Sequence, residues 1–170
     1  MAAPSLNESE LRFLRGLLRR KVRFIVVGLS AAALQGAPVV TQDVDLWFED
    51  LSDPRIRDAL REVDAAYVAP SILNPPMFSG GDIELFDIVL TMHGLEAFPD
   101  EFRNCIEVSL GRHKLKVLRL DRILASKRAA NRPKDRLVIS VLEDSLAANT
   151  VARRRKKRTV PSPKKRKPSR

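Results

Sequence analysis

Residues 22–50, VRFIVVGLSAAALQGAPVVTQDVDLWFED, contain the pattern that decides the fold of this chain. Residues 22–27 form an apolar, β-branched run of strand length that only Arg23 interrupts. Gly28 follows, a residue type that turns use for positive φ or for a close approach of the backbone. Ser30 stands where a helix is predicted to begin, and Gly36 is predicted to end that helix. The stretch therefore predicts a buried strand, a glycine turn and a short helix.

A second strand is predicted after this helix, and it carries two carboxylates, Asp43 and Asp45. Side chains two positions apart in a strand leave the same face, so Val44 and Leu46 are expected on the other face. Two negative charges on one face repel each other unless a cation compensates them. The pair therefore predicts a site for a divalent metal ion.

A third candidate carboxylate lies in residues 82–90, DIELFDIVL, which alternate as a strand does. The alternation places Asp87 between aliphatic residues and Glu84 on the opposite face. One interpretation of Asp87 is a strand-end carboxylate that reaches water. The interpretation that we favour is a third ligand beside Asp43 and Asp45, with Glu84 as the fallback, since only one of the two can serve.

The net charge of +10 is concentrated at one end of the 170-residue chain. Residues 151–170 hold eleven of the 31 lysines and arginines and none of the 21 acids. Residues 1–150 are therefore close to neutral, and they are predicted to form one globular domain. The remaining residues, rich in Lys, Arg, Pro and Ser, are predicted to be a disordered basic tail.

This basic tail has three interpretations. Cations that meet phosphates release counterions, so the tail can bind RNA or DNA without sequence preference. It can also be a nuclear localisation signal in a eukaryotic host, or a solubilising segment with no partner. We favour the first, in which the tail tethers the domain to a nucleic acid such as tRNA.

The composition argues against a disulfide, a membrane span and a zinc site. The single cysteine, Cys105, excludes an intramolecular disulfide. No apolar run approaches the ~20 residues of a membrane span, and the N-terminus lacks the apolar region of a signal peptide. His93 and His113 have no zinc-ligand spacing and are not favoured as catalytic residues. We expect a cytoplasmic protein without membrane contact.

The other elements follow from capping residues and apolar periodicity. A capping box of Asn7 and Glu10 opens the first predicted helix, whose basic face we expect to be solvated; the alternative is a phosphate-binding role for Arg19 or Arg20. Residues 70–81 are expected to be irregular. The remaining predictions are helices over residues 54–64, 121–130 and 134–148, a short strand over residues 65–68, and a β-hairpin over residues 105–118.

Four bases, Lys127, Arg128, Arg132 and Lys134, cluster where the predicted helices over residues 121–130 and 134–148 meet. Ordinary solvated bases at a turn explain this cluster. The alternative is a line of cations that faces a triphosphate.

Three segments, GLSAAALQGAPVVTQDVDLWF, LFDIVL and DRILASKRAANRPKD, together resemble the small bacterial members of the nucleotidyltransferase superfamily. These members include the minimal nucleotidyltransferases and the related abortive-infection toxins. The resemblance spans roughly residues 20–148. It implies an α/β (α+β) fold with a mixed β-sheet flanked by helices.

The resemblance also implies a role for particular residues. Gly28 and Ser30 fall at the turn that receives the nucleotide phosphates, and Lys127 matches a recurring nucleotide-binding position, followed in the motif by Arg132 and Asp135. The ligands of two Mg2+ ions would be Asp43, Asp45 and Asp87, which are also the catalytic residues.

The activity implied is transfer of a nucleoside monophosphate from an NTP to a hydroxyl on protein or RNA. The protein would then be the toxin of a toxin–antitoxin pair, with an antitoxin as partner. Two residues depart from the pattern: Leu29 replaces the second glycine of the turn, and Val39 replaces a basic residue before the aspartate pair. A catalytically degenerate member of the fold, acting as a nucleic-acid- or partner-binding module, is the alternative.

Overall fold

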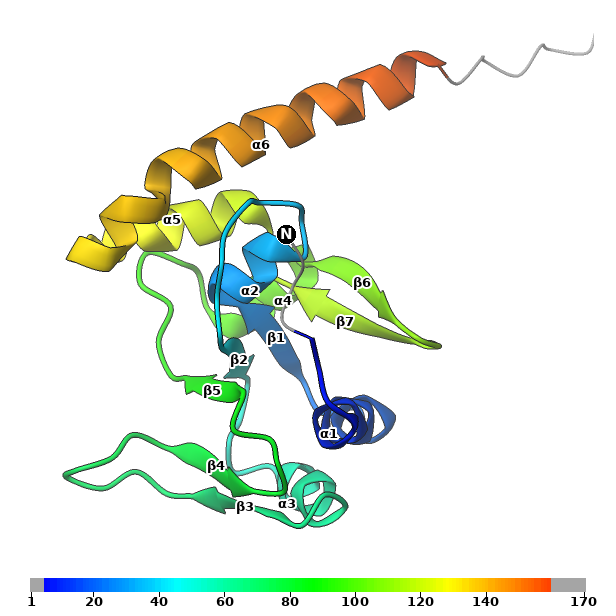
Figure 1. The fold of residues 1–170 in the computed structure, drawn as a ribbon, viewed down its shortest axis with the longest axis vertical. Coiled ribbons are helices and arrows are strands. Elements are labelled where there is room, and N and C mark those ends of the chain that lie inside the picture. The colour runs from blue at the N-terminus through cyan, green and yellow to red at the C-terminus, as the bar shows by residue number, and fades with distance from the viewer. Residues whose placement is uncertain (1–4, 160–170) are drawn as a thin grey trace, which may run out of the picture.

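The computed structural model describes residues 5–159, and side chains through residue 152. Helices and strands alternate irregularly along the chain (Figure 1). In chain order they are α1 (Glu8–Arg19), β1 (Phe24–Val27), α2 (Gly28–Ala33), β2 (Val44–Phe48), α3 (Pro54–Arg61), β3 (Ala65–Val68), β4 (Met77–Gly80), β5 (Phe86–Val89), α4 (Phe98–Asn104), β6 (Ile106–Leu110), β7 (His113–Val117), α5 (Leu120–Ala130) and α6 (Pro133–Thr159).

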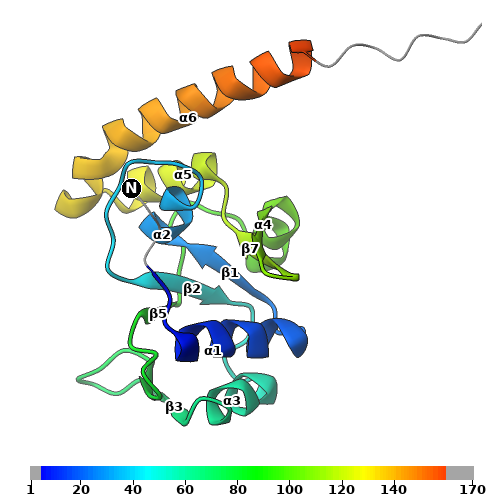
Figure 2. The same cartoon turned by 45° about the vertical axis from the view of Figure 1, so that its right-hand side comes forward.

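The centre of the molecule is a five-stranded mixed sheet in the order β5-β2-β1-β7-β6. β1 runs antiparallel to β2 and parallel to β7, while β2 and β5 are parallel to each other. In Figure 2, α1 and α3 lie below β1 and β2, and α2, α5 and α6 lie above them. The fold is thus a mixed sheet with helices on both sides, as the family resemblance of the sequence implies.

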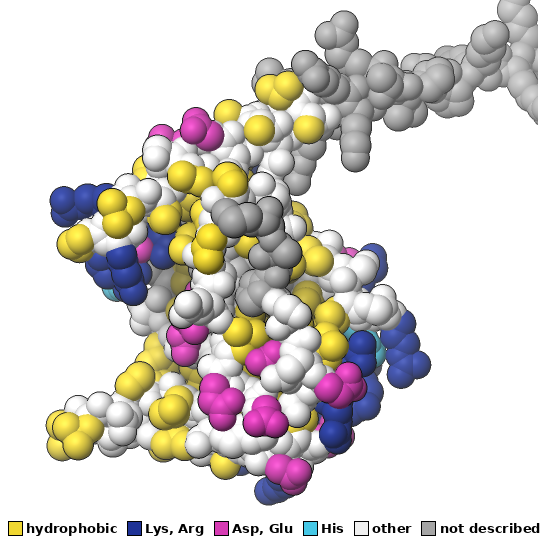
Figure 3. All heavy atoms as spheres, viewed as in Figure 1, with side chains coloured by type: hydrophobic (Ala, Val, Ile, Leu, Met, Phe, Trp, Pro, Cys, Tyr) yellow, Lys and Arg dark blue, Asp and Glu magenta, His cyan; other side chains and the backbone are white. Residues whose placement is uncertain are grey.

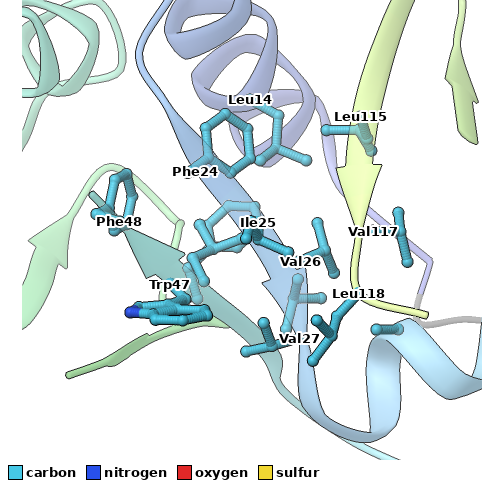
Figure 4. Close-up of a cluster of buried hydrophobic side chains, with 14 of the residues drawn as sticks. Leu14, Phe24, Ile25, Val26, Val27, Trp47, Phe48, Leu115, Val117 and Leu118 are labelled. Carbon is cyan, nitrogen blue, oxygen red and sulfur yellow. The ribbon is translucent and has the colours of Figure 1, made fainter. Parts of the chain in front are cut away.

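β1 is the core of this sheet, because all four of its residues are buried. An apolar, β-branched strand of this kind packs well only where both faces are covered. Figure 4 shows Ile25 and Val27 of β1 among side chains from β2 and β7, including Trp47 and Val117. These buried side chains fix the C-terminal end of β1, and thereby the position of the Gly28 turn that follows it.

α1 is attached to this core through its apolar side. Asn7 and Glu10 form the predicted capping box, with hydrogen bonds of 2.8 and 2.6 Å. Phe13 is fully buried and contacts Phe78 and Phe86, with ring centroids 5.2 and 5.5 Å apart. The capped helix therefore joins the small β3–β4 sheet to the main sheet.

Several predictions of secondary structure are confirmed. The strand before Gly28, the strand of residues 65–68 and the hairpin before residue 118 all form. The helix predicted from residue 54 is α3, and the Asp53 side chain caps it by accepting a hydrogen bond from the Arg55 amide. Among residues 5–159, no helix is both long enough and apolar enough to cross a membrane.

Residues 70–81 are not wholly irregular, contrary to the prediction. Met77–Gly80 forms β4, which pairs antiparallel with β3. Phe78 is buried and contacts Phe13 and Phe48, so a tertiary contact rather than a local pattern orders this strand.

Other element boundaries also differ. α4 is not predicted from the sequence, and Phe98 at its start packs edge-on against Trp47. The strand predicted over residues 82–90 is only Phe86–Val89, since Asp82 has a φ of 53° and belongs to a turn. α2 begins at Gly28 rather than at Ser30, without a side-chain cap.

The last helix is longer than predicted. α6 continues to Thr159, so residues 151–159, expected in a disordered tail, are helical. Alanine, lysine and arginine are good helix formers, and no glycine or proline occurs between Pro133 and Pro161. The prediction of disorder for residues 160–170 lies outside the described residues.

Candidate active site

The three predicted carboxylates lie on one side of the paired strands β2 and β5. Asp45 and Asp87 are register partners in this parallel pair, and Asp43 precedes β2 by one residue. All three line a pocket of about 350 Å3, which we call the aspartate pocket, together with Gly28 and Lys127. The molecule is hollowed beside the end where α5 meets α6 (Figure 3).

The negative charges of the carboxylates in this pocket repel one another. Partial burial raises the pKa of Asp45 to about 6, and the charges of Asp87 and Asp43 add to this while Lys127 opposes it. Burial, and then the charge of Asp43, also raises the pKa of Asp87 above its usual range. Within the described part of the chain, none of the three carboxylates accepts a hydrogen bond or forms an ion pair within 4 Å. The pocket thus holds negative charge that no direct contact neutralises.

Gly28 brings the backbone against one of these carboxylates. Its φ is +65°, a conformation that side-chain-bearing residues rarely adopt. A Cβ at this position would lie 1.9 Å from Oδ2 of Asp45. Only glycine therefore allows β1 to turn into α2 with Asp45 in this position.

A buried ion-pair cluster forms the opposite wall, where α5 meets α6. Asp135 is fully buried and accepts hydrogen bonds from the Lys127 ammonium (2.8 Å) and from Nε of Arg132 (2.7 Å). Burial opposes the ionisation of Asp135, but these hydrogen bonds outweigh it and lower the pKa to about 2. Since Lys127 is only 17% exposed, Asp135 holds its ammonium in a defined position at the pocket.

Comparison with known proteins identifies the fold. No family model and no curated protein matches this chain. A crystal structure of ANT(2")-Ia, an aminoglycoside nucleotidyltransferase, in complex with adenylyl-2"-tobramycin matches 85% of this chain and 94% of its own, with 13% identity and a TM-score of 0.53. The chain has a nucleotidyltransferase fold.

Two other predicted residues have different places in this nucleotidyltransferase fold. Ser30 is buried, and its hydroxyl donates a hydrogen bond of 3.0 Å to the Val27 carbonyl, so it does not line the aspartate pocket. Glu84 precedes β5 and is also outside the pocket lining, which leaves Asp87 with the pair. Of the two departures from the family pattern, Leu29 lines the pocket and Val39 does not.

The pocket also contains residues that the sequence reasoning did not select. Thr91, Met92 and His93 come from the segment after β5, and Thr41 from the loop before β2. The Thr41 hydroxyl donates to the carbonyl of Asp43, with 3.1 Å between the oxygens. The sequence feature that could have pointed to these residues is their position, since each lies a few residues from a selected aspartate, on a connecting segment beside the site.

The three carboxylates of the aspartate pocket suit Mg2+ if the protein supplies only part of the coordination shell. Within residues 5–159, no three His, Cys, Asp or Glu side chains are close enough to surround one ion. Mg2+ in nucleotide sites commonly takes one or two carboxylates and completes its shell with phosphate oxygens and water. Unpaired aspartates on adjacent strands fit that requirement.

We expect Asp135→Asn to destabilise the protein by about 1–2 kcal/mol, because Lys127 and Arg132 lose their shared carboxylate while Arg132 stays solvated. With its low pKa, Asp135 stabilises the fold above about pH 4, and this contribution is lost as pH falls toward 2. Urea unfolding at pH 3 and pH 7 measures the effect, which should shrink at the lower pH.

A matched control is Glu101→Gln, since Glu101 is also buried and ion-paired, with Arg122, but does not line the pocket. Both variants should lose stability. Only Asp135→Asn should weaken NTP binding, and equal binding in the two variants would contradict the positioning of Lys127.

Proposed function

We propose that this protein is a Mg2+-dependent nucleotidyltransferase that moves a nucleoside monophosphate from an NTP to a hydroxyl group on protein or RNA. The observation that carries the proposal is the register of Asp45 with Asp87, which places two carboxylates on adjacent strands beside the Gly28 turn. The fold shared with ANT(2")-Ia supports it. The toxin role, the antitoxin partner and the cytoplasmic location stay predictions.

Asp43, Asp45 and Asp87 would share the ligation of two Mg2+ ions, each of which would take one or two of these carboxylates and complete its shell with phosphate oxygens and water. Bound Mg2+ supplies charge neutralisation for the triphosphate and for the leaving pyrophosphate. Burial, and then the charges of Asp87 and Asp43, raise the pKa of Asp45 to about 6, and a bound cation would stabilise the ionised carboxylates against both effects. Since carboxylates bind metal in their ionised form, binding should weaken as pH falls through 6.

The other side chains divide the remaining tasks between them. Lys127, held by Asp135, presents a cation to the phosphates from the wall formed by α5 and α6. Asp87 is the more solvated of the two register partners and has a raised pKa. It is therefore placed to accept the proton of an acceptor hydroxyl that approaches from solvent.

Calorimetry with each of the four NTPs, with Mg2+ and with EDTA, tests the nucleotide site. Wild type should bind at least one NTP saturably and only with Mg2+, and Asp43→Ala/Asp45→Ala should not bind it. Transfer is then measured with an α-labelled NTP and candidate RNA or protein acceptors. A folded wild-type protein that binds no NTP would contradict the proposal.

A second candidate function is a catalytically silent binding module, and Leu29 favours it. This side chain lines the pocket immediately after the Gly28 turn, where it occupies space beside the expected phosphates.

If Leu29 closes the site, Leu29→Gly should create saturable Mg2+–NTP binding that the wild type lacks, at a helix cost of about 1 kcal/mol. Leu29→Met, which keeps the side-chain volume, is the control and should bind as wild type does. Strong NTP binding by the wild type would exclude this second function.

A further inference from the structure

A second hollow, separate from the aspartate pocket, is lined almost wholly by bases. We call it the basic groove; its volume is about 380 Å3, and its lining is Arg15, Arg19, Gly111, Arg112 and His113. These residues come from α1 and from the turn between β6 and β7. Figure 3 shows Lys, Arg and His side chains gathered on the edge of the molecule that lies across from the hollow beside α5 and α6.

The local geometry explains why these side chains converge. Arg15 and Arg19 are four residues apart on α1 and therefore share one side of the helix. His113 and Leu115 share a face of β7, and the buried Leu115 lies with Leu14 of α1 around one small apolar cavity. His113 is therefore carried on the face that α1 covers, at the turn end of the hairpin.

The charges in the groove are poorly compensated. Within the described residues, the side chains of Arg15, Arg112 and His113 form no hydrogen bond and no ion pair. Arg19 pairs with Glu62 at 2.6 Å, but that carboxylate also pairs at 2.7 Å with Arg20, the residue that follows α1. Like charges four residues apart destabilise a helix unless an anion lies between them.

We propose that the basic groove binds phosphate groups, as part of a nucleic-acid backbone or a free polyphosphate. Guanidinium groups match phosphate oxygens in planar, bidentate pairs. Apart from the imidazole of His113, the residues that line the groove are glycine and arginines, with no Phe, Tyr, Trp or aliphatic side chain to form a base pocket, so we expect recognition of phosphate, independent of sequence.

The groove does not depend on the proposed catalytic function. Val26 of β1 pairs with Val117 of β7, and the two strands are parallel. His113 lies four residues before Val117, whereas the aspartate pocket begins at Val27, just after Val26. At about 3.3 Å per residue, the two sites are about 17 Å apart along the strands.

The two histidines of the chain provide a separate probe for each site, because His93 lines the aspartate pocket and His113 lines the basic groove. The experiment is NMR of the full-length protein labelled at histidine, titrated with tripolyphosphate in EDTA. We expect saturable movement of the His113 signals and none of His93. Because the probe is local, it reports on the groove rather than on the bases of residues 151–170.

Arg15→Gln/Arg112→Gln should weaken this binding about tenfold or more, since two charged hydrogen-bonding groups are lost. The control is Arg61→Gln/Arg103→Gln, which removes the same charge from two arginines that are 75% and 70% exposed on α3 and α4. Unmoved His113 signals, or equal weakening in both double variants, would overturn the proposal.

A second titration with a short single-stranded RNA distinguishes the source of the phosphate. Movement of His113 at lower concentrations of RNA than of tripolyphosphate assigns the groove to a nucleic-acid backbone. Movement with tripolyphosphate alone assigns it to a small polyanion. A later titration with Mg2+ and NTP, followed at His93, tests the catalytic proposal separately.

Discussion

We expect Asp45→Asn to make the metal-free protein more stable at pH 8 while it removes Mg2+–NTP binding. Asp45 is held among Asp43 and Asp87 without a hydrogen-bonding partner in the described residues, and burial with these charges raises its pKa from 3.8 to about 6. A shift of this size corresponds to at most about 3 kcal/mol, and water that reaches the pocket reduces the expected gain to about 2 kcal/mol.

The sign of the effect depends on pH. Because the folded-state pKa is the higher one, Asp45 stabilises the fold fully below about pH 4, and this contribution is lost as pH rises through 6. The advantage of the asparagine variant should therefore be absent at pH 4 and complete at pH 8. Urea unfolding in EDTA across this range measures it.

Asp144→Asn is the control, since Asp144 is exposed on α6 and has no ion pair within the described chain. Its free energy of unfolding should follow that of the wild type at every pH. Nucleotidyl transfer by Asp45→Asn, once the acceptor is found, should fall about 100-fold or more, because a metal ligand is lost. An advantage of Asp45→Asn over wild type that is no larger at pH 8 than at pH 4 would contradict the raised pKa of Asp45.

Gly28→Ala should leave a folded protein that does not bind NTP. The added Cβ would lie 1.9 Å from Oδ2 and 2.8 Å from Cγ of Asp45, so the carboxylate must rotate away. A side chain can rotate without unfolding the domain, and the cost in stability is therefore mainly the strain of a positive φ, about 1–2 kcal/mol. The cost in activity is larger, because a displacement of about 1 Å at a reacting group can reduce the rate about 100-fold.

Gly111→Ala is the control that separates the loss of stability caused by a positive φ from the loss of activity caused by displacement of Asp45. Gly111 has a φ of +60°, close to that of Gly28, but a Cβ there would meet nothing within 4 Å. Both variants should lose similar stability by urea unfolding, and only Gly28→Ala should lose Mg2+–NTP binding by calorimetry. Loss of binding in both variants, or in neither, would contradict the role assigned to the Gly28 turn.

Local pattern was enough to predict the parts of the fold that depend on neighbours in sequence. The apolar run before Gly28 forms β1, and the Asn7–Glu10 capping box forms as expected. Two-residue alternation predicted Asp43 and Asp45 on one face of a strand, but Asp43 lies before β2, and the two aspartates come together as lining residues of one pocket. Alternation could not place Asp87, since that depends on β5 pairing parallel to β2 in the right register.

The predictions that were wrong involve contacts between distant residues. β4 and α4 are ordered by Phe78 and Phe98, which pack against aromatic residues far away in sequence. The burial of Ser30 could not be predicted from its position two residues after Gly28. It results from a hydrogen bond that the hydroxyl donates back to the Val27 carbonyl. Local signals thus located the pocket, and tertiary packing determined which side chains reach it.

The strand order has a consequence for how the aspartate pocket can come apart. β2 has a strand on each side, whereas β5 is an edge strand of the sheet, and within residues 5–159 its ladder joins it to β2 alone. Cooperative opening begins where few hydrogen bonds must break, so β5 can detach while the β1–β2 pair stays intact. Asp87 would leave with it, and Asp45 would remain. Assembly of the site is therefore a separate and weaker equilibrium than folding of the domain, and a molecule that pairs with the open edge of β5 could shift it.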